Sequence, residues 1–315
     1  MMRLLSIVAL TVAFALGTTP LRAAEPMTVL LDWFVNPDHA PLIVAKEHGH
    51  FSAAGLEVRL IAPADPNDPP KLVAAGKADL AISYQPQLHL QIEAGLPLRR
   101  IATLVATPLN SLVVLKDGPI KTIADLKGKT IGFSIGGFED AILGRMLEQN
   151  GLKLSDVKLV NVNFSLSPSI ISGNVDGVIG AFRNFELNQM DIVGRAGRAF
   201  YPEEHGVPPY DELIVVANSN SLDDAKHRKF LSALEAATID LINNPEGGWA
   251  TFIKAHPDLD NELNKRAWRD TLRRFALRPR ALDKARYARF AAFLAETKLI
   301  KKARPVEAYA VEIVD

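Results

Sequence analysis

Cysteine is absent from all 315 residues of the sequence. Its absence excludes disulfide bonds, zinc–thiolate centres and thiol nucleophiles, and also the cysteine to which a bacterial lipoprotein attaches its lipid. An excess of either charge is lacking too, because 36 Lys and Arg residues balance 36 Asp and Glu residues. A chain without net charge has no electrostatic preference for nucleic acid or for an anionic membrane surface. We therefore expect neither as a partner.

Catalytic and metal-binding motifs are lacking as well. The sequence has no G-x-S-x-G, no Walker phosphate loop and no H-E-x-x-H. The short motif His48-Gly49-His50 ends an apolar helical segment, and we interpret it as surface rather than as a metal site. We expect no catalytic residues, no metal and no cofactor.

The N-terminal segment has the pattern of an export signal. Arg3 precedes the apolar run LLSIVALTVAFALG, and Ala23-Ala24 offers a small-residue cleavage site. The run is shorter than the roughly 20 residues that a membrane-spanning helix needs, and no later apolar segment is long enough. We predict a cleaved signal peptide at residues 1–24 and a soluble mature chain.

One plan of strands and helices occurs twice. In the first half, TVLLDW, EVRLI and ADLAISY are predicted strands around the helical segment APLIVAKEHGHF. In the second half, KTIGFS, KLVNVNF and VDGVIGAF are the strands around EDAILGRMLEQN. A Gly-Leu pair follows each of these helices, at Gly55 and Gly151, and a Gly-x-x-Asp motif ends at Asp79 and at Asp176. The alternation predicts two α/β lobes with parallel sheets.

Two extended stretches connect the lobes. TLVATPLNSLVVLKDG leads from the first lobe to the second and PPYDELIVVANSN leads back, after which the chain is mostly helical. We assign residues 25–108 and 218–315 to the first lobe, on which the C-terminal helices pack, and residues 109–217 to the second. No coiled-coil pattern stands out, so we expect a monomer.

The candidate site lies in the loops that follow the strands, because ligands of open parallel sheets bind beyond the C-terminal strand ends. The loops selected in this way are residues 33–39, 83–87, 134–139 and 182–186. Aromatic residues gather there, although they make up only 7% of the chain. Aromatic faces stack on flat rings, while amides and carboxyl groups read ring nitrogens and amino groups. We therefore predict an interlobe cleft for a small heteroaromatic ligand. The candidate ligand-binding residues are Trp33, Asn36, His39, Tyr84, Gly137, Phe138, Phe182, Asn184 and Glu186.

Several of these residues have an alternative interpretation. Phe182 and Phe185 cannot both face the cleft if the strand continues, and we favour Phe182. Glu186 also suits the first turn of a helix, where a carboxylate is favourable. His39 can begin the first helix instead of contacting a ligand. The IGGF loop around Gly137 allows backbone N–H groups to approach a ligand at a helix start.

The segment LDWFVNPDHAPLIVAKEHGHF resembles the opening signature of ABC-transporter solute-binding proteins for thiamine-pyrimidine precursors, LDW-x-x-N-x-x-H followed by a helix and Gly-x-Phe. GKADLAISYQP, LKGKTIGFSIGGFE, VDGVIGAFRNFE and GVPPYDELIVVAN resemble further blocks of that family in the same order. The resemblance covers essentially the whole mature chain. It implies a periplasmic-binding-protein fold, with two α/β lobes joined by two crossovers and a ligand cleft between them.

The resemblance also implies a ligand, partners and a location. Relatives bind a formylated aminopyrimidine or, in some branches, a riboflavin-like compound, and they deliver it to an ABC permease and ATPase. Without a lipoprotein cysteine, the mature chain is expected in the periplasm. The positions that match the family's pyrimidine site are Trp33, Asn36, Tyr84, Gly137, Phe138, Asn184 and Glu186.

Departures from the family pattern keep alternatives open. Pro37-Asp38 replaces a common Thr-Asn, and Arg183 replaces an aromatic residue and suits an anionic solute. The superfamily also includes a pyrimidine-phosphate synthase, whose pyridoxal-phosphate lysine and sacrificial histidine correspond here to Ser83 and Gln87. Its cysteine-rich iron-binding stretch has no counterpart. The resemblance favours transport over catalysis, and a sensory receptor remains an alternative.

Overall fold

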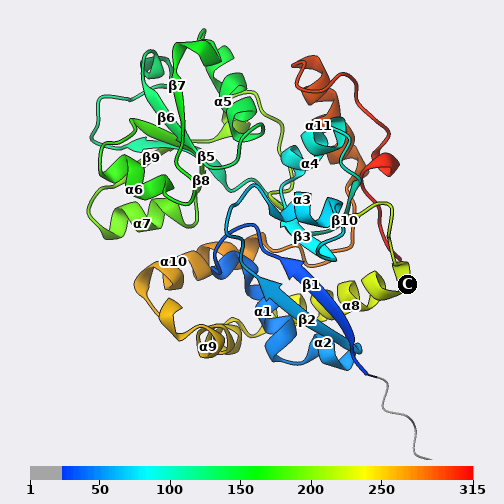
Figure 1. Cartoon of the computed structure of the whole chain (residues 1–315). Helices are drawn as coiled ribbons and strands as arrows, with labels where there is room; N and C mark the ends of the chain where they lie inside the picture. Colours follow the sequence, from blue (N-terminus) through cyan, green and yellow to red (C-terminus); the bar gives the residue numbers. More distant parts are fainter. Residues whose placement is uncertain (1–22, 315) are drawn as a thin grey trace, which may run out of the picture.

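The computed structural model describes residues 23–314. The predicted signal peptide at residues 1–24 therefore lies outside the described residues, apart from Ala23 and Ala24. Figure 1 shows the middle of the chain, drawn in green, set apart from the parts that both ends of the chain form. Within residues 23–314, no helix combines the length and the apolar character needed to cross a membrane.

Each lobe is built on a five-stranded sheet. The strand order is β2-β1-β3-β10-β4 in the first lobe and β7-β6-β8-β5-β9 in the second. The strands of the first sheet are β1 (Glu25–Leu30), β2 (Leu56–Ile61), β3 (Leu80–Ser83), β4 (Leu98–Val105) and β10 (Leu213–Asn218). Those of the second are β5 (Asn110–Leu115), β6 (Thr130–Phe133), β7 (Lys158–Asn161), β8 (Gly177–Phe182) and β9 (Gly197–Phe200). The repeated plan in the sequence is thus present in the structure.

The two Gly-x-x-Asp motifs have the same structural role in the two lobes. Asp79 Oδ2 accepts a hydrogen bond from Thr28 N at 2.7 Å, and Asp176 Oδ2 accepts one from Thr130 N at 2.8 Å. Each carboxylate binds the backbone of the first parallel strand of its own repeat, β1 or β6. The motif therefore ties the start of β3 to β1 in the first lobe and the start of β8 to β6 in the second.

The sheets are mixed rather than parallel, which corrects the sequence prediction. β1 pairs in parallel with β2 and β3, and β6 pairs in parallel with β7 and β8. However, β10 is antiparallel to β3 and β4, and β5 is antiparallel to β8 and β9. Both reversed strands enter their sheet directly from the other lobe, whereas parallel neighbours need a crossover connection. A buried strand has the same apolar composition whether it runs parallel or antiparallel to its neighbours. The sequence therefore did not reveal that β5 and β10 are reversed.

The chain crosses between the lobes twice, after β4 through residues 106–109 and after β9 through residues 201–212. The predicted division assigns residues 109–217 to the second lobe, but β10 belongs to the first sheet. The return crossing therefore ends before β10. The sequence placed it later because PPYDELIVVANSN is one continuous extended stretch.

Helices cover both sheets, and the C-terminal ones return to the first lobe. The α-helices are α1 (Ala40–Glu47), α2 (His50–Ala53), α3 (Pro69–Ala74), α4 (Gln85–Glu93), α5 (Glu139–Glu148), α6 (Leu166–Ile171), α7 (Glu186–Ile192), α8 (Asp224–Asn243), α9 (Pro245–Ala255), α10 (Glu262–Thr271) and α11 (Lys284–Glu296). The 3₁₀ helices are η1 (Pro37–His39), η2 (Ile123–Leu126), η3 (Leu154–Asp156), η4 (Pro202–Glu204), η5 (Pro257–Leu259), η6 (Leu272–Arg274) and η7 (Val306–Ala308). α8 and α9 contact α1, while α10 contacts both η1 and α7 (Figure 1). α10 therefore links the lobes beside the crossovers.

Candidate ligand-binding cleft

A cavity lies between the lobes at the ends of four strands. Its lining comes mainly from the loops after β1, β3, β6 and β8, the loops that the strand-end rule selects, with additions from α6 and from β8 itself. The lining residues are Asp32, Trp33, Asn36, Asp38, Tyr84, Ile135, Phe138, Glu139, Leu166, Gly180, Phe182, Phe185 and Glu186. The space among these residues, including the part open to solvent, is about 450 Å³.

Aromatic rings from the two lobes face each other across this cavity. Tyr84 follows β3 in the first lobe, and its ring stacks on Phe138 of the second lobe with centroids 5.3 Å apart and planes 21° from parallel. Phe182, at the end of β8, meets Tyr84 edge-on at 6.4 Å. A flat ligand ring between two aromatic faces needs them about 7 Å apart, because each stacking contact takes about 3.5 Å. A movement of one lobe against the other changes this separation.

A second aromatic cluster joins the lobes next to the first. Trp33 packs edge-on against Phe164 at 4.6 Å, and Phe34 lies 5.9 Å from Phe185. Both Phe182 and Phe185 line the cavity, which corrects the expectation that only Phe182 does. β8 ends at Phe182, so strand alternation does not extend to Phe185 in the following turn. Phe164 was missed because it lies between β7 and α6, outside the four loops considered.

Asp32 connects two of the predicted residues at the base of the cavity. Its Oδ2 accepts a hydrogen bond from Tyr84 Oη at 2.7 Å, and its Oδ1 lies 2.9 Å from His39 Nε2. Burial, with nearby Asp32, raises the pKa of Tyr84 well above its ordinary value, so the phenol remains a hydrogen-bond donor. His39 is fully buried and does not line the cavity. His39 therefore supports Asp32 and does not make the predicted ligand contact. Asp32 was missed because it lies within the predicted strand segment TVLLDW.

Two glutamate side chains reach the cavity with raised pKa values. Glu186 begins α7, and its Oε2 accepts a hydrogen bond from Phe182 N at 2.6 Å. Glu139 begins α5, and its Oε2 accepts one from Ser134 N at 2.7 Å. Burial raises the pKa of each carboxyl group to about 8. Both groups are therefore largely protonated at pH 7, and each offers an O–H donor beside its acceptor oxygens.

The carboxyl group of Glu139 fits because residue 180 is glycine. Gly180 lies within β8 with φ at +99°, a conformation that other residues rarely adopt. A Cβ at this position would lie 2.4 Å from Glu139 Oε1. The sequence analysis missed both residues, because neither a helix-start glutamate nor a strand glycine indicates a ligand site by itself.

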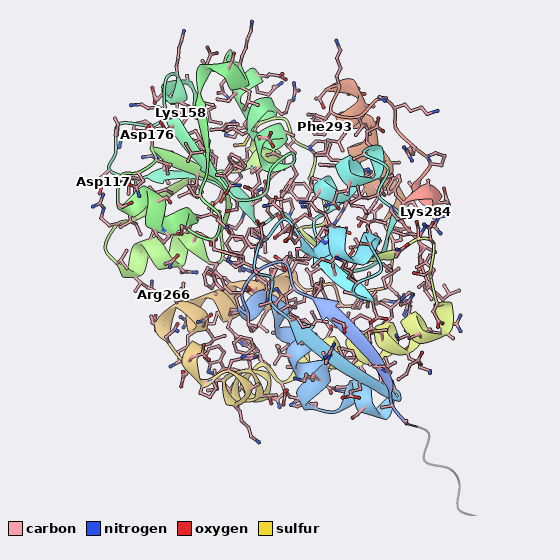
Figure 2. All side chains as sticks on the ribbon, in the orientation of Figure 1. Asp117, Lys158, Asp176, Arg266, Lys284 and Phe293 are labelled. Atoms are coloured by element: carbon pink, nitrogen blue, oxygen red, sulfur yellow. The ribbon has the colours of Figure 1, made fainter. Side chains whose placement is uncertain are left out.

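Buried hydrogen bonds hold the two lobes together beside the cavity. Asn184, which follows β8, donates through Nδ2 to Asp38 Oδ1 at 2.6 Å and to Thr271 Oγ1 at 2.7 Å. Thr271 Oγ1 lies 2.9 Å from the same Asp38 oxygen, and burial raises the pKa of Asp38 to about 6. Arg266 of α10, labelled in Figure 2, pairs with Asp191 of α7 at 2.7 Å. Asn184 does not line the cavity, so this predicted ligand residue joins the lobes instead.

The loop between β6 and α5 forms another contact between the lobes. Asn67, before α3, donates a hydrogen bond to Ser134 O at 3.1 Å and accepts one from Gly136 N at 3.2 Å. Gly137, beside them, is exposed and absent from the cavity lining. The predicted backbone contact between Gly137 and a ligand is therefore not supported, because this glycine-rich loop directs the Gly136 N–H to Asn67.

Arg183 is fully engaged by the protein. Its Nη1 and Nη2 pair with the two carboxylate oxygens of Glu203 at 2.6 and 3.0 Å. Its Nε donates to Leu109 O at 3.2 Å and Nη2 donates to Asn110 O at 3.0 Å, while the guanidinium lies 4.1 Å from the Tyr201 ring centroid. The side chain thus ties the two crossovers together. This geometry removes the argument that Arg183 receives an anionic ligand.

The structure brings most of the predicted residues to the cavity. Those that line it are Trp33, Asn36, Tyr84, Phe138, Phe182 and Glu186. The amide of Asn36 is engaged locally, because its Oδ1 accepts from Asp38 N at 2.8 Å and its Nδ2 donates to Phe34 O at 3.1 Å. The lining residues that the sequence analysis did not name as candidates are Asp32, Ile135, Glu139, Leu166 and Gly180, of which Ile135 and Glu139 lie in the selected loop 134–139.

A family profile and several curated relatives match the chain. The profile of the family described as NMT1/THI5 like matches residues 36–247, more than half of the chain. A Haemophilus influenzae protein designated a thiamine biosynthesis protein is 53% identical over 305 residues, which cover 96% of this chain and 97% of that protein. A formylaminopyrimidine-binding protein of Halalkalibacterium halodurans is 37% identical over 203 residues, covering 64% and 62%. A 4-amino-5-hydroxymethyl-2-methylpyrimidine phosphate synthase of Uromyces fabae is 28% identical over 258 residues, covering 77% and 74%.

Solved structures share the fold. The alkanesulfonate-binding protein of Xanthomonas axonopodis pv. citri, bound to MOPS, superposes with a TM-score of 0.72 at 17% identity, covering 92% of this chain and 99% of that one. A Candida albicans protein described as having the generic periplasmic binding protein fold gives a TM-score of 0.70 at 16% identity, covering 91% and 96%. These comparisons confirm the predicted periplasmic-binding-protein fold.

Proposed function

The chain belongs to the NMT1/THI5-like family, and from that premise we propose that it is the solute-binding component of an ABC importer for an aminopyrimidine related to thiamine precursors. The observation that carries this proposal is the interlobe cavity, in which aromatic faces of both lobes meet beside two protonated carboxyl groups. The relative named a formylaminopyrimidine-binding protein supports the ligand class.

The ligand ring enters between Tyr84 and Phe138. Stacking on one face from each lobe contributes about 0.5–1.5 kcal/mol per aromatic pair beyond burial. Its insertion requires the 5.3 Å separation of the two centroids to widen, which a small opening of the lobes provides. When the lobes close again, each contributes one of the two stacking contacts, so both contacts exist only in the closed form.

The carboxyl groups of Glu186 and Glu139 form hydrogen bonds with the edge of the ligand ring. A protonated carboxyl group donates its O–H to a ring nitrogen and accepts from a neighbouring amino group through its carbonyl oxygen. An aminopyrimidine presents this alternation of acceptor and donor. An alkanesulfonate lacks this alternation, because its oxygens only accept hydrogen bonds. This is why we favour a neutral heterocycle over an alkanesulfonate or another anion.

Catalysis is the alternative that the synthase relatives raise. At the positions to which the resemblance assigns the synthase lysine and histidine, Ser83 Oγ donates a hydrogen bond to Gln87 Oε1 at 2.9 Å, and both side chains are buried. Neither can form a Schiff base, and the sequence has no cysteine for an iron site. We therefore propose that the protein binds and delivers its ligand without converting it.

The location and partners follow from the same proposal. The predicted export signal and the missing lipoprotein cysteine favour a periplasmic protein. A monomer is expected because no coiled-coil pattern stands out in the sequence. It would deliver its ligand to a permease coupled to a cytoplasmic ATPase. A sensory role would use the same cavity with a different membrane partner.

The ligand class is tested by native mass spectrometry and thermal-shift measurements. The purified protein is mixed with formylaminopyrimidine, hydroxymethylpyrimidine, thiamine, riboflavin and MOPS. We expect a bound mass and a rise in melting temperature with the aminopyrimidines, because a ligand at one hundred times its Kd stabilises by about 2.7 kcal/mol. Stabilisation by riboflavin or MOPS alone would contradict the proposal.

A further inference from the structure

Three potential metal ligands meet on the first lobe, at the end of α1 opposite the cavity. His48 follows α1, His50 begins α2 and Asp240 lies in the last turn of α8. One possible ligand atom of each lies within 4.8 Å of the others. The sequence motif His48-Gly49-His50 offered only two imidazoles and was interpreted as a helix end. The structure adds a carboxylate from a distant segment of the chain.

Within residues 23–314, the Nε2 atom of His50 makes no hydrogen bond along its lone-pair or N–H direction. Its Nε2 lies 2.8 Å from Asp240 Oδ2, yet this buried nitrogen has no hydrogen-bond partner among the described residues. The distance suits a hydrogen bond and the direction does not. Two ligand atoms that share one zinc ion lie roughly 3.4 Å apart, given metal–ligand distances of about 2.0–2.2 Å and tetrahedral angles. A small rotation of either side chain supplies that spacing.

Neighbouring residues orient the His48 ring toward His50 and Asp240. Its Nε2 lies 2.8 Å from Thr251 Oγ1 of α9, and its ring centroid lies 6.3 Å from that of His50. Gly49 between them has φ at +75°, which lets the chain turn so that the two imidazoles come near each other. A hydroxyl group bound to one ring nitrogen fixes the orientation of a histidine whose other nitrogen binds metal.

We propose that His48, His50 and Asp240 form a surface site for a divalent transition-metal cation of the zinc class. Two imidazoles and one carboxylate are ligands that Zn²⁺ accepts, and water completes the coordination. α1 runs from His39 beside the cavity to His48 at this site, a length of about 12 Å. The cation would therefore fix the far end of α1, whose near end follows His39, the residue bound to Asp32, and would connect α1 to α8. The site is independent of the ligand proposed above.

The test is a titration of the tag-free protein with Zn²⁺ after treatment with a chelator. Competition with a chromogenic chelator measures the stoichiometry and affinity, and the melting temperature is measured in parallel. We expect one zinc per chain, a raised melting temperature, and at least tenfold weaker binding in both His50→Ala and Asp240→Asn. Asp240→Asn keeps the size of the side chain, so its fold is expected to survive if His50→Ala disturbs α2.

The matched control is His205→Ala, which removes a partly exposed histidine of the second lobe. It should leave zinc binding unchanged. The proposal is overturned if the wild-type protein binds no stoichiometric zinc, if Asp240→Asn binds as the wild type does, or if His205→Ala loses as much affinity as His50→Ala. Aminopyrimidine binding measured on the same samples separates this result from that of the proposed function.

Discussion

The protonation state of two carboxyl groups, those of Glu186 and Glu139, determines which hydrogen bonds the cavity can offer to a ligand. Glu186 and Glu139 are buried, and the backbone hydrogen bonds that their carboxyl groups accept lower the pKa by less than the loss of water raises it. Protonation lets these residues act as donors at neutral pH. Their placement depends on Gly180, whose missing Cβ leaves room for the Glu139 carboxyl group.

Gly180→Ala is expected to destabilise the protein by about 1–3 kcal/mol, through the positive φ and the contact with Glu139. Gly144→Ala is the matched control, because this glycine lies within α5 with nothing within 4 Å of an added Cβ. Alanine there should stabilise the helix by up to about 1 kcal/mol. Urea denaturation of both variants measures the two effects, and equal effects of the same sign would contradict the geometry.

Glu186 and Glu139 should make the free energy of unfolding fall as the pH rises from 5 to 8. Asp38 and Glu212, whose pKa values burial raises to about 6 and about 7, act in the same direction, and His89, whose pKa burial lowers to about 3, acts in the opposite one. The pKa of Glu186 is about 8 in the folded protein against an ordinary 4.5, and that of Glu139 is also about 8. The folded state binds these protons more tightly than the unfolded state. The stabilisation is therefore complete below the unfolded value and is lost as the pH approaches 8. The slope is at most about 1.4 kcal/mol per pH unit for each group.

Glu186→Gln should remove part of this slope, because glutamine keeps the shape of the protonated side chain and does not titrate. The exposed Glu57 provides the control, and Glu57→Gln should leave the slope unchanged. Urea denaturation at pH 5, 6, 7 and 8 measures the slope for all three proteins. An unchanged slope in Glu186→Gln would show that the Glu186 carboxyl group does not give up its proton in this range.

At the scale of helices and strands, contacts between the lobes hold the two sides of the cavity together. Asn184 follows β8, Asp38 lies in η1 and Thr271 ends α10, so three segments meet in one buried network. The Asn67 contacts with the β6–α5 loop form a second connection. Both networks require the lobes to be close, and both are lost when the lobes separate.

Asn184→Ala is expected to weaken ligand binding by roughly tenfold to a hundredfold, because losing a buried hydrogen-bond donor costs the closed form about 1–3 kcal/mol. Asn218→Ala is the control, since the Asn218 amide binds Val73 O and Ala74 O within the first lobe. Calorimetry measures affinity, and small-angle scattering measures whether ligand still reduces the radius of gyration. Unchanged affinity in Asn184→Ala would mean that this network does not favour closure.

The elements were largely predictable from sequence, and their contacts were not. Strand-end loops and their aromatic residues follow from hydrophobic patterns, which is why Trp33, Tyr84 and Phe182 were found. Side-chain direction depends on partners distant in the chain. Asn184 was therefore predicted to contact a ligand, although it binds Asp38. The reversed direction of β10 was also missed, because its apolar residues would suit either orientation.

At the scale of the whole molecule, two lobes of the same design are joined by two crossovers. Glu212 in the return crossing accepts hydrogen bonds from Leu109 N and Asn110 N, at 2.5 and 2.9 Å, while Arg183 holds the carbonyl groups of the same two residues. Residues 109 and 110 are thus fixed from both sides. The junction is rigid at this point, and rotation of the lobes is expected in the neighbouring residues 106–108 and 201–209.

The central claim, an interlobe cavity selective for an aminopyrimidine, is tested most directly by isothermal titration calorimetry of formylaminopyrimidine into protein that has been unfolded, freed of ligand and refolded. The account predicts one site per chain with a Kd of about 1 μM or lower, equivalent to about −8 kcal/mol or better. It also predicts at least tenfold weaker binding in Tyr84→Ala, because one of the two stacking faces is lost. No heat of binding with formylaminopyrimidine, together with saturable binding of a flavin or a sulfonate, would contradict it.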